Sequence, residues 1–231
     1  MGTRARIVSF NIQHGMRGDG ARVDIDLTGS VAAGLHPDVL ALQEVDVGVP
    51  RSGLVDEAAE VAAACGLAFA FGKAARVGVI GEYGNALCAR RPLEDVEVRR
   101  LPRRRFRSEP RSVLLARVDL GITEATFAAT HLTIHREEVF EQLKAAVALL
   151  LARPAPWVLV GDLNLRPEQL APVIEASDLE LAGGGLTFPA SKPRIRIDHV
   201  AVGGGLRIAD VQIHESAASD HRPLVVELEA C

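Results

Sequence analysis

Apolar residues fall into short continuous runs. Between these runs lie segments in which the apolar residues recur at the spacing of an α-helix. The most continuous run, 158–160, lies between Trp157 and Gly161 and is typical of a strand covered on both faces. Segment 136–152 instead repeats its apolar residues on one helical face, and Pro154 follows directly. A helix is therefore predicted there, followed by a buried strand.

The same criteria predict the other elements. Further strands are expected at 5–12, 38–43, 67–72, from 82 to the proline at 92, and at 96–101, 113–118, 125–132, 194–202, 206–214 and 224–228. Further helices are expected at 24–34, 54–65 and 167–177, and a flexible loop at 73–81. Because there is no fixed-period repeat and no long linker, residues 1–231 are expected to form a single domain.

Polar side chains recur where the apolar strands end. They are Asn11, Glu44, His131, Asp162 with Asn164, Asp198, and Asp220 with His221. Each alone is also consistent with a strand-end turn, a surface carboxylate or a structural histidine. Because strand ends on one side of a sheet can converge on a pocket, the recurrence favours a site.

The residue types narrow the chemistry of this candidate site. Carboxylates and amides suit a hard divalent cation such as Mg²⁺, and histidines beside acids suit proton transfer. A Ser-His-Asp triad is disfavoured, because no G-x-S-x-G motif is present. A zinc site is disfavoured by the absence of H-E-x-x-H and by a count of only three cysteines.

Composition sets limits on partners and location. The formal net charge is -4 and the pI is about 6.0, so no whole-chain attraction to nucleic acid is expected. The three cysteines fit a reducing compartment, and no apolar leader is apparent, so a cytoplasmic location is expected. The most apolar helical segment, 143–152, is too short to cross a bilayer.

One local stretch departs from the acidic average. Seven arginines and Phe106 lie within 99–111. Such a stretch could meet a phosphate backbone, although a solvated hairpin loop is the favoured interpretation.

Taken in order, the polar motifs resemble those of the endonuclease/exonuclease/phosphatase superfamily. This group includes exonuclease III-like repair nucleases, pancreatic-type deoxyribonuclease, sphingomyelinases and inositol polyphosphate 5-phosphatases. The matching motifs are Asn11, Gln43-Glu44, Gly84-Asn85-Ala86, Glu109-Pro110-Arg111, Thr130-His131-Leu132, Gly161-Asp162-Leu163-Asn164, Ile197-Asp198-His199 and Ser219-Asp220-His221-Arg222-Pro223. Each is weak alone, but the ordered set is specific and spans residues 5–228.

The resemblance implies a four-layer α/β sandwich, with two mixed β-sheets packed face to face and helices on the outside. It implies a Mg²⁺-dependent hydrolase that cleaves a phosphoester by in-line attack of water, with Mn²⁺ as an alternative ion. Glu44 would be the main metal ligand, helped by Asn11 and Asp220. Asp162 would position or deprotonate the water, and Asn164 would orient the phosphate.

The remaining roles also follow from the resemblance. His221 would contact the phosphate or act as acid or base, held by Asp198. His131 would bind a phosphate oxygen with support from Glu109. The expected substrate contacts are Asn85, Arg111 and Thr187.

The substrate is left open by departures from the family pattern. Aromatic residues are only 4% of the chain, and Phe10 precedes Asn11 where repair members commonly carry tryptophan. A DNA endonuclease or exonuclease therefore stays an alternative, as does a catalytically silent binding module. The oligomeric state is not predicted.

Overall fold

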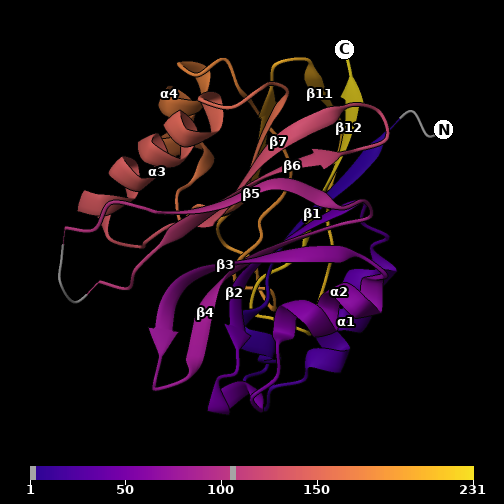
Figure 1. Ribbon diagram of the computed structural model, residues 1–231, viewed down its shortest axis with the longest axis vertical. Coiled ribbons are helices and arrows are strands. Elements are labelled where there is room, and N and C mark those ends of the chain that lie inside the picture. The colour runs from indigo at the N-terminus through magenta and orange to yellow at the C-terminus, as the bar shows by residue number, and fades with distance from the viewer. Residues whose placement is uncertain (1–3, 105–107) are drawn as a thin grey trace.

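Two six-stranded sheets pack face to face, and helices cover both outer faces (Figure 1). This computed structural model describes residues 4–104 and 108–231. Arg105, Phe106 and Arg107 of the basic stretch lie outside the described residues, so its expected hairpin loop is described only in part. The four layers confirm the α/β sandwich expected from the resemblance.

The first sheet has the order β11-β12-β1-β2-β4-β3. Its strands are β1 (Ala5–Asn11), β2 (Val39–Val47), β3 (Ala68–Val77), β4 (Gly81–Ala89), β11 (Leu206–Ile213) and β12 (Leu224–Ala230). The second sheet has the order β5-β6-β7-β8-β10-β9. Its strands are β5 (Leu93–Arg100), β6 (Ser112–Asp119), β7 (Glu124–His131), β8 (Trp157–Asp162), β9 (Glu180–Leu181) and β10 (Asp198–Gly203).

Helices α1 (Ile25–Gly34) and α2 (Glu57–Cys65) lie on the first sheet, and α3 (Arg136–Leu151) and α4 (Pro167–Glu175) on the second (Figure 1). Two short 3₁₀ helices, η1 (Gln13–Gly15) and η2 (Pro50–Ser52), follow β1 and β2. Asp24 and Asp56 cap α1 and α2 by accepting hydrogen bonds from Leu27 N and Ala59 N. None of the described helices is long and apolar enough to span a bilayer.

The core between the sheets explains why the strands read as continuous apolar runs. Ile7, Leu114, Phe127, Val160 and Val226 are fully buried there. A second apolar layer packs under α1 and α2, and a third under α3 and α4. Burial of each large side chain contributes roughly 1.5–3 kcal/mol, so both faces of the central strands stabilise the fold.

Each sheet contains one parallel pair, and these pairs position the candidate site. β1 runs parallel to β2 with Asn11 opposite Gln43, and β7 runs parallel to β8 with His131 opposite Asp162. Parallel strands end at the same edge, so the polar residues that follow them gather at one end of the sandwich.

Several predicted elements were wrong in extent, and two of them show the physical reason. Residues 73–81 are mostly strand, because β3 pairs with β4 as far as Val77 opposite Gly81. Residues 194–197 precede β10, since Ile195 pairs with Phe188 in an isolated bridge instead. In both places backbone hydrogen bonds to distant segments override the local pattern.

Candidate active site

The amide of Asn11 joins the two sheets. Asn11 is fully buried at the end of β1, and its Nδ2 donates to Glu44 Oε1 and to Asp162 Oδ2, both at 3.1 Å. Its Oδ1 accepts from the backbone N–H of Gln13 at 3.0 Å, which fixes the amide orientation. Glu44 and Asp162 therefore face one another across a single nitrogen.

A local distortion of β2 presents Glu44 to this point. The pairing of β2 with β4 shifts register between Leu42 and Val45, and Glu44 has φ of 58°. The left-handed conformation is strained for a residue with a side chain, and such distortions commonly redirect side chains at functional sites. The strand was expected to end at Gln43, but β2 continues to Val47, and Glu44 reaches the site from a bulge within the strand.

Glu44 is electrostatically unfavourable as it stands. Burial raises its pKa, the Asn11 hydrogen bond and the positive charges of Arg111 and His221 lower it, and the negative charge of Asp220 raises it. Asn11 is its one side-chain hydrogen-bond donor among the described residues, and none of their cationic groups forms an ion pair with it. A divalent cation held by these oxygens would offset both the burial and the repulsion.

Asp162 is placed by a glycine that no other residue could replace without rearrangement. A Cβ on Gly161, whose φ is 143°, would lie 1.9 Å from the carbonyl oxygen of Thr130 on β7. Beyond the strand, Asn164 adopts φ of 50° and its N–H donates to Asp162 Oδ1 at 3.0 Å. Burial, and then repulsion from Asp198, raise the Asp162 pKa to about 7.

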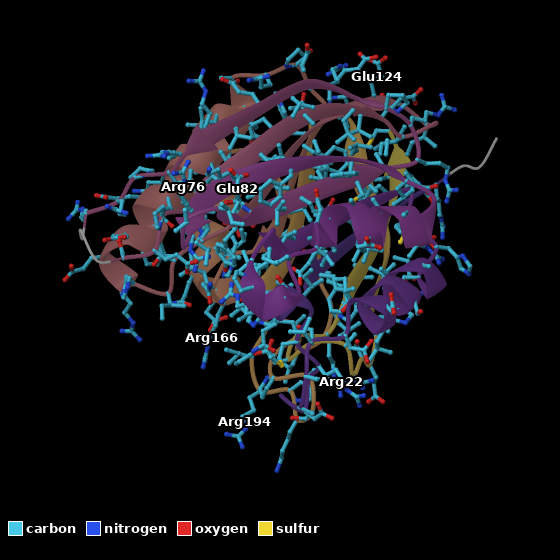
Figure 2. The ribbon with its side chains drawn as sticks, turned by 60° about the horizontal axis from the view of Figure 1, so that its bottom comes forward. Arg22, Arg76, Glu82, Glu124, Arg166 and Arg194 are labelled. Atoms are coloured by element: carbon cyan, nitrogen blue, oxygen red, sulfur yellow. The ribbon has the colours of Figure 1, made fainter. Side chains whose placement is uncertain are left out.

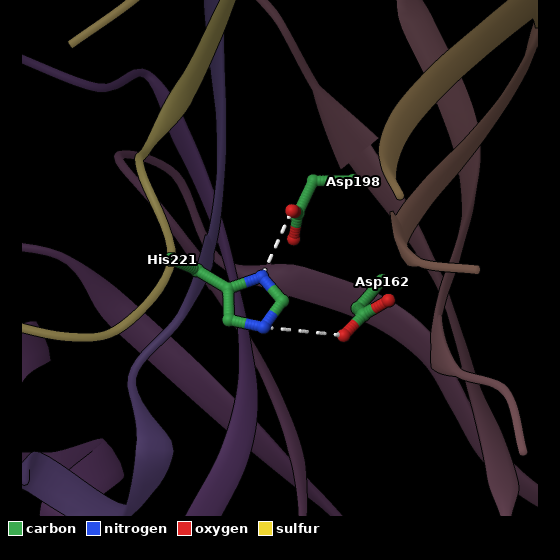
Figure 3. A group of neighbouring side chains, drawn as sticks. All are labelled: Asp162, Asp198 and His221. Atoms are coloured by element: carbon green, nitrogen blue, oxygen red, sulfur yellow. Dashed lines mark hydrogen bonds and ion pairs between the residues drawn. The ribbon is translucent and has the colours of Figure 1, made fainter. Parts of the chain in front are cut away.

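His221 lies between two carboxylates, as Figure 3 shows. Its Nδ1–H donates to Asp198 Oδ2 at 2.9 Å, and its Nε2 lies 3.8 Å from Asp162 Oδ2. Burial opposes the charge on the ring, but attraction and hydrogen bonding by Asp198, together with Asp162, outweigh it and raise the pKa of His221 to about 10. His221 is therefore an imidazolium at neutral pH.

His131 has the opposite electrostatic character. Arg111 Nη1 lies 3.0 Å from its Nδ1, and since a guanidinium only donates, Nδ1 accepts and Nε2 carries the ring proton. That Nε2 lies 3.4 Å from Asp162 Oδ2. Burial and the Arg111 charge hold the pKa of His131 well below its ordinary value, so it is neutral.

Asn164 and Glu109 complete this side of the group. Asn164 Nδ2 donates to the carbonyl oxygen of Leu132 at 2.8 Å and lies 3.1 Å from His131 Nε2. Glu109 is 46% exposed and contacts Arg111 Nη2 at 3.2 Å. Glu109 is thus linked to His131 only indirectly, because Glu109 contacts Arg111 and Arg111 contacts the ring.

The two remaining expected substrate contacts have structural partners. Asn85 Nδ2 donates to the carbonyl oxygen of Ser112 at 3.2 Å and so ties β4 to β6 across the sandwich. Thr187 Oγ1 accepts from the N–H groups of Ile197 and Asp198, at 3.3 and 3.4 Å. Thr187 therefore fixes the backbone that carries Asp198.

Two further neighbours were not singled out from the sequence. Ser219 Oγ donates to the carbonyl oxygen of Asn11 at 2.6 Å and accepts from His221 N–H at 3.2 Å. The Phe188 ring packs on His221 with centroids 4.8 Å apart. Ser219 stands inside a motif that the sequence did reveal, whereas nothing in the pattern around Phe188 indicates its contact.

Two sets of side chains in this site could be considered as ligands of a cation, and they differ in how well they suit one. Ligand atoms of Asp162, Asp198 and His221 lie within 4.8 Å of one another. However, His221 is protonated and its Nδ1 is committed to Asp198, which leaves it a poor metal ligand. Glu44 and Asp220 offer carboxylate oxygens without an ion-pair partner among the described residues, and they fit a hard cation better.

Residues 8–221 match the sequence model of the Endonuclease/Exonuclease/phosphatase family. The chain belongs to this family. The match spans every expected site residue, from Asn11 to His221, and members of the family are usually phosphoester hydrolases that use a divalent metal. None of the curated protein sequences matches this chain.

Solved structures confirm the endonuclease/exonuclease/phosphatase fold. An endonuclease/exonuclease/phosphatase from Beutenbergia cavernae is 24% identical with a TM-score of 0.83, covering 99% of this chain and 72% of that one. Truncated TDP2 from Caenorhabditis elegans is 19% identical with a TM-score of 0.70, covering 98% of each chain. ANGEL2, described as a 2′,3′-cyclic phosphatase, is 15% identical with a TM-score of 0.72, covering 97% and 95%.

Proposed function

We propose that this protein is a Mg²⁺-dependent hydrolase that cleaves a phosphoester by in-line attack of water. The observation that carries the proposal is the Asn11 amide at the end of the sandwich. Its Nδ2 donates to Glu44 Oε1 and to Asp162 Oδ2, each at 3.1 Å. One carboxylate is thereby available to a cation and the other to a nucleophile. Family membership supports the same reaction class.

Glu44, with Asn11 and Asp220, would hold the Mg²⁺, and Mn²⁺ would satisfy the same oxygen donors. When bound, the ion neutralises charge on the phosphate and the leaving oxygen. Asn11 could bind the ion only through Oδ1, and this atom accepts a hydrogen bond from Gln13 N–H. The role of Asn11 in this structure is therefore to orient Glu44 through its Nδ2.

The side chains of the second sheet would perform the proton transfers. Asp162, whose pKa is raised to about 7, is suited to accept a proton from the attacking water near neutral pH. His221 is cationic and is suited to stabilise the phosphate charge or protonate the leaving group, while Asp198 holds its ring. Neutral His131 can donate its Nε2 proton to a phosphate oxygen, and Asn164 fixes the loop beside it.

The wider context of the activity is also proposed. Substrates are phosphoesters, with nucleic acid as one candidate. The cysteines Cys65, Cys88 and Cys231 are all unpaired, which supports the expected cytoplasmic location.

The test is hydrolysis of bis-p-nitrophenyl phosphate by purified protein, with and without Mg²⁺, beside plasmid and oligonucleotide substrates. We expect metal-dependent turnover that falls about 100-fold or more in Asp162→Asn and in His221→Gln. Circular dichroism and melting temperature should show both variants folded. The exposed Asp210→Asn on β11 serves as the control and should leave turnover unchanged.

Each outcome has a distinct meaning. Cleavage of DNA with steep salt dependence would favour the nuclease alternative. Folded wild-type protein that hydrolyses none of these substrates with either metal would contradict the proposal and favour a silent binding module. Unchanged turnover in either site variant would show that hydrolysis occurs elsewhere.

A further inference from the structure

A groove lined by three arginines is formed in part by the chain segments that carry two residues of the candidate active site. Its volume is about 440 Å³, and Arg166, Arg194 and Arg196 line it together with the glycines 183–185 and Leu186. Glu168 is its one acidic lining residue. Figure 2 shows Arg166 and Arg194 projecting at one end of the molecule, with Glu124 at the other.

These arginines differ from most others in having no counterion. Within residues 4–104 and 108–231, most other arginines have a carboxylate within 4.0 Å, yet none lies within 4.0 Å of a nitrogen of Arg166, Arg194 or Arg196. Arg166 and Arg194 are exposed. Positive charge is thus concentrated in the groove and left available to a ligand.

Arg196 is the strongest indication of a built anion site. It is 8% exposed, its Nη1 donates to the carbonyl oxygen of Gly184 at 3.4 Å, and its buried Nε has no partner among the described residues. Burial lowers its pKa, and the charge of Glu168 offsets this only in part. A buried cation without a paired anion is costly, and a bound anion would relieve that cost.

The walls of the groove continue directly into the catalytic segments. Arg166 lies two residues after Asn164, and Arg196 lies two residues before Asp198. The two walls are joined where Leu163 N donates to Ile197 O at 2.9 Å. The groove is therefore built from the same two chain segments that carry Asn164 and Asp198.

We propose that this groove binds a second phosphate group carried by the substrate, next to the phosphoester that is cleaved. This inference rests on the proposed hydrolase function and specifies its substrate class. Guanidinium groups form paired hydrogen bonds with phosphate oxygens, and the glycines at 183–185 add no side chains to the lining of the groove. The second phosphate could belong to a nucleotide strand or to a small bisphosphorylated molecule, which share this chemistry.

The experiment compares substrates that differ only in that phosphate. The first pair is 3-hydroxypropyl 4-nitrophenyl phosphate with and without phosphate on its free hydroxyl. The second pair is thymidine 5′-(4-nitrophenyl phosphate) with and without a 3′-phosphate. The quantity measured is the ratio of kcat/KM within each pair, for wild-type protein and for the double variant Arg166→Gln, Arg194→Gln.

We expect a ratio of about 10 or more in wild-type protein and a ratio near 1 in the double variant, because each charged contact contributes roughly tenfold. A preference in the propyl pair indicates recognition of the phosphate alone, and one confined to the thymidine pair indicates a nucleotide. Arg91→Gln removes a charge beside Asp119, outside the groove, and should retain the wild-type ratio. Arg196→Lys keeps the positive charge but loses the planar guanidinium that forms paired hydrogen bonds, so it should lower the ratio of kcat/KM only in part.

Failure of this inference can be told apart from failure of the hydrolase proposal. Equal kcat/KM within both pairs, alongside normal hydrolysis of bis-p-nitrophenyl phosphate, would overturn the groove assignment alone. If no ester is cleaved, the hydrolase proposal fails, and calorimetry with propane-1,3-diyl bisphosphate then tests the groove. Absence of binding, or equal affinity in wild-type protein and the double variant, would overturn the groove assignment as well.

Discussion

At the scale of single residues, the pKa values of Asp162 and His221 are both raised, and the two shifts suit different roles in proton transfer. Burial raises the pKa of Asp162 to about 7, whereas carboxylates around His221 raise its pKa to about 10. Near pH 8, Asp162 is therefore largely ionised while His221 still carries its proton. This combination provides a base and an acid at the same pH.

Asp198 controls one of these groups, which gives a test by pH. Asp198→Asn removes the charge that raises the pKa of His221 and also weakens the hold on its ring. We expect kcat to fall about 100-fold or more. Because the pKa of His221 falls toward its ordinary value, loss of activity on the alkaline side should begin at lower pH than in wild-type protein.

The measurement is a pH–rate profile at saturating Mg²⁺. Asp210→Asn should keep the wild-type profile, because the Asp210 side chain is exposed on β11 and is not part of the candidate site. An Asp198→Asn enzyme with an unchanged alkaline limb would show that His221 does not act as the protonated group.

The polar ends of strands could be predicted from sequence because an amide or carboxylate after an apolar run needs a partner. Asn11, Asp162 and His131 were found in this way, and the structure brings them together. Contacts made by loops were not predictable. Ser219 lies in a recognised motif, but its hydrogen bond to Asn11 O, like the packing of Phe188 on His221, depends on the path of turns in the whole fold.

At the scale of elements, the β7–β8 pair tolerates no side chain at Gly161. Gly161→Ala would place its Cβ 1.9 Å from Thr130 O in a left-handed conformation. We expect a loss of about 2 kcal/mol or more in the free energy of unfolding. Activity should fall as well, because Asp162 is the next residue.

Urea unfolding provides the measurement, with Gly34→Ala as the matched control. Nothing lies within 4 Å of a Cβ at Gly34, which ends α1, so that change should be neutral or stabilise by up to roughly 1 kcal/mol. A Gly161→Ala protein as stable and active as wild type would show that the β7–β8 register can shift freely.

Element predictions failed where local composition and long-range pairing disagree. β3 continues through Lys73, Ala75 and Arg76, residues of weak strand preference, because β4 supplies its hydrogen bonds. The bulge at Glu44 was likewise invisible, since it arises from the mismatch of β2 with β4. Helices with clear apolar faces, such as α3, were predicted closely.

At the scale of the molecule, the site exists only because two sheets meet. Glu44 and Asn11 come from the first sheet, and Asp162 and His131 come from the second. Periodicity could not predict this meeting, because the contact between the sheets joins Asn11 to Asp162, which lie 151 positions apart in the chain. The order of the motifs, and the family they resemble, supplied the four-layer arrangement.

The most direct test of this two-sheet centre is a double-mutant cycle on kcat/KM for Mg²⁺-dependent hydrolysis, using Glu44→Gln, Asp162→Asn and the double variant. Each single change should lower kcat/KM about 100-fold or more. The double variant should be only slightly less active than the less active of the two single variants, because both residues serve one centre. Losses that simply multiply, or a Glu44→Gln protein with the wild-type dependence on Mg²⁺, would contradict a shared centre.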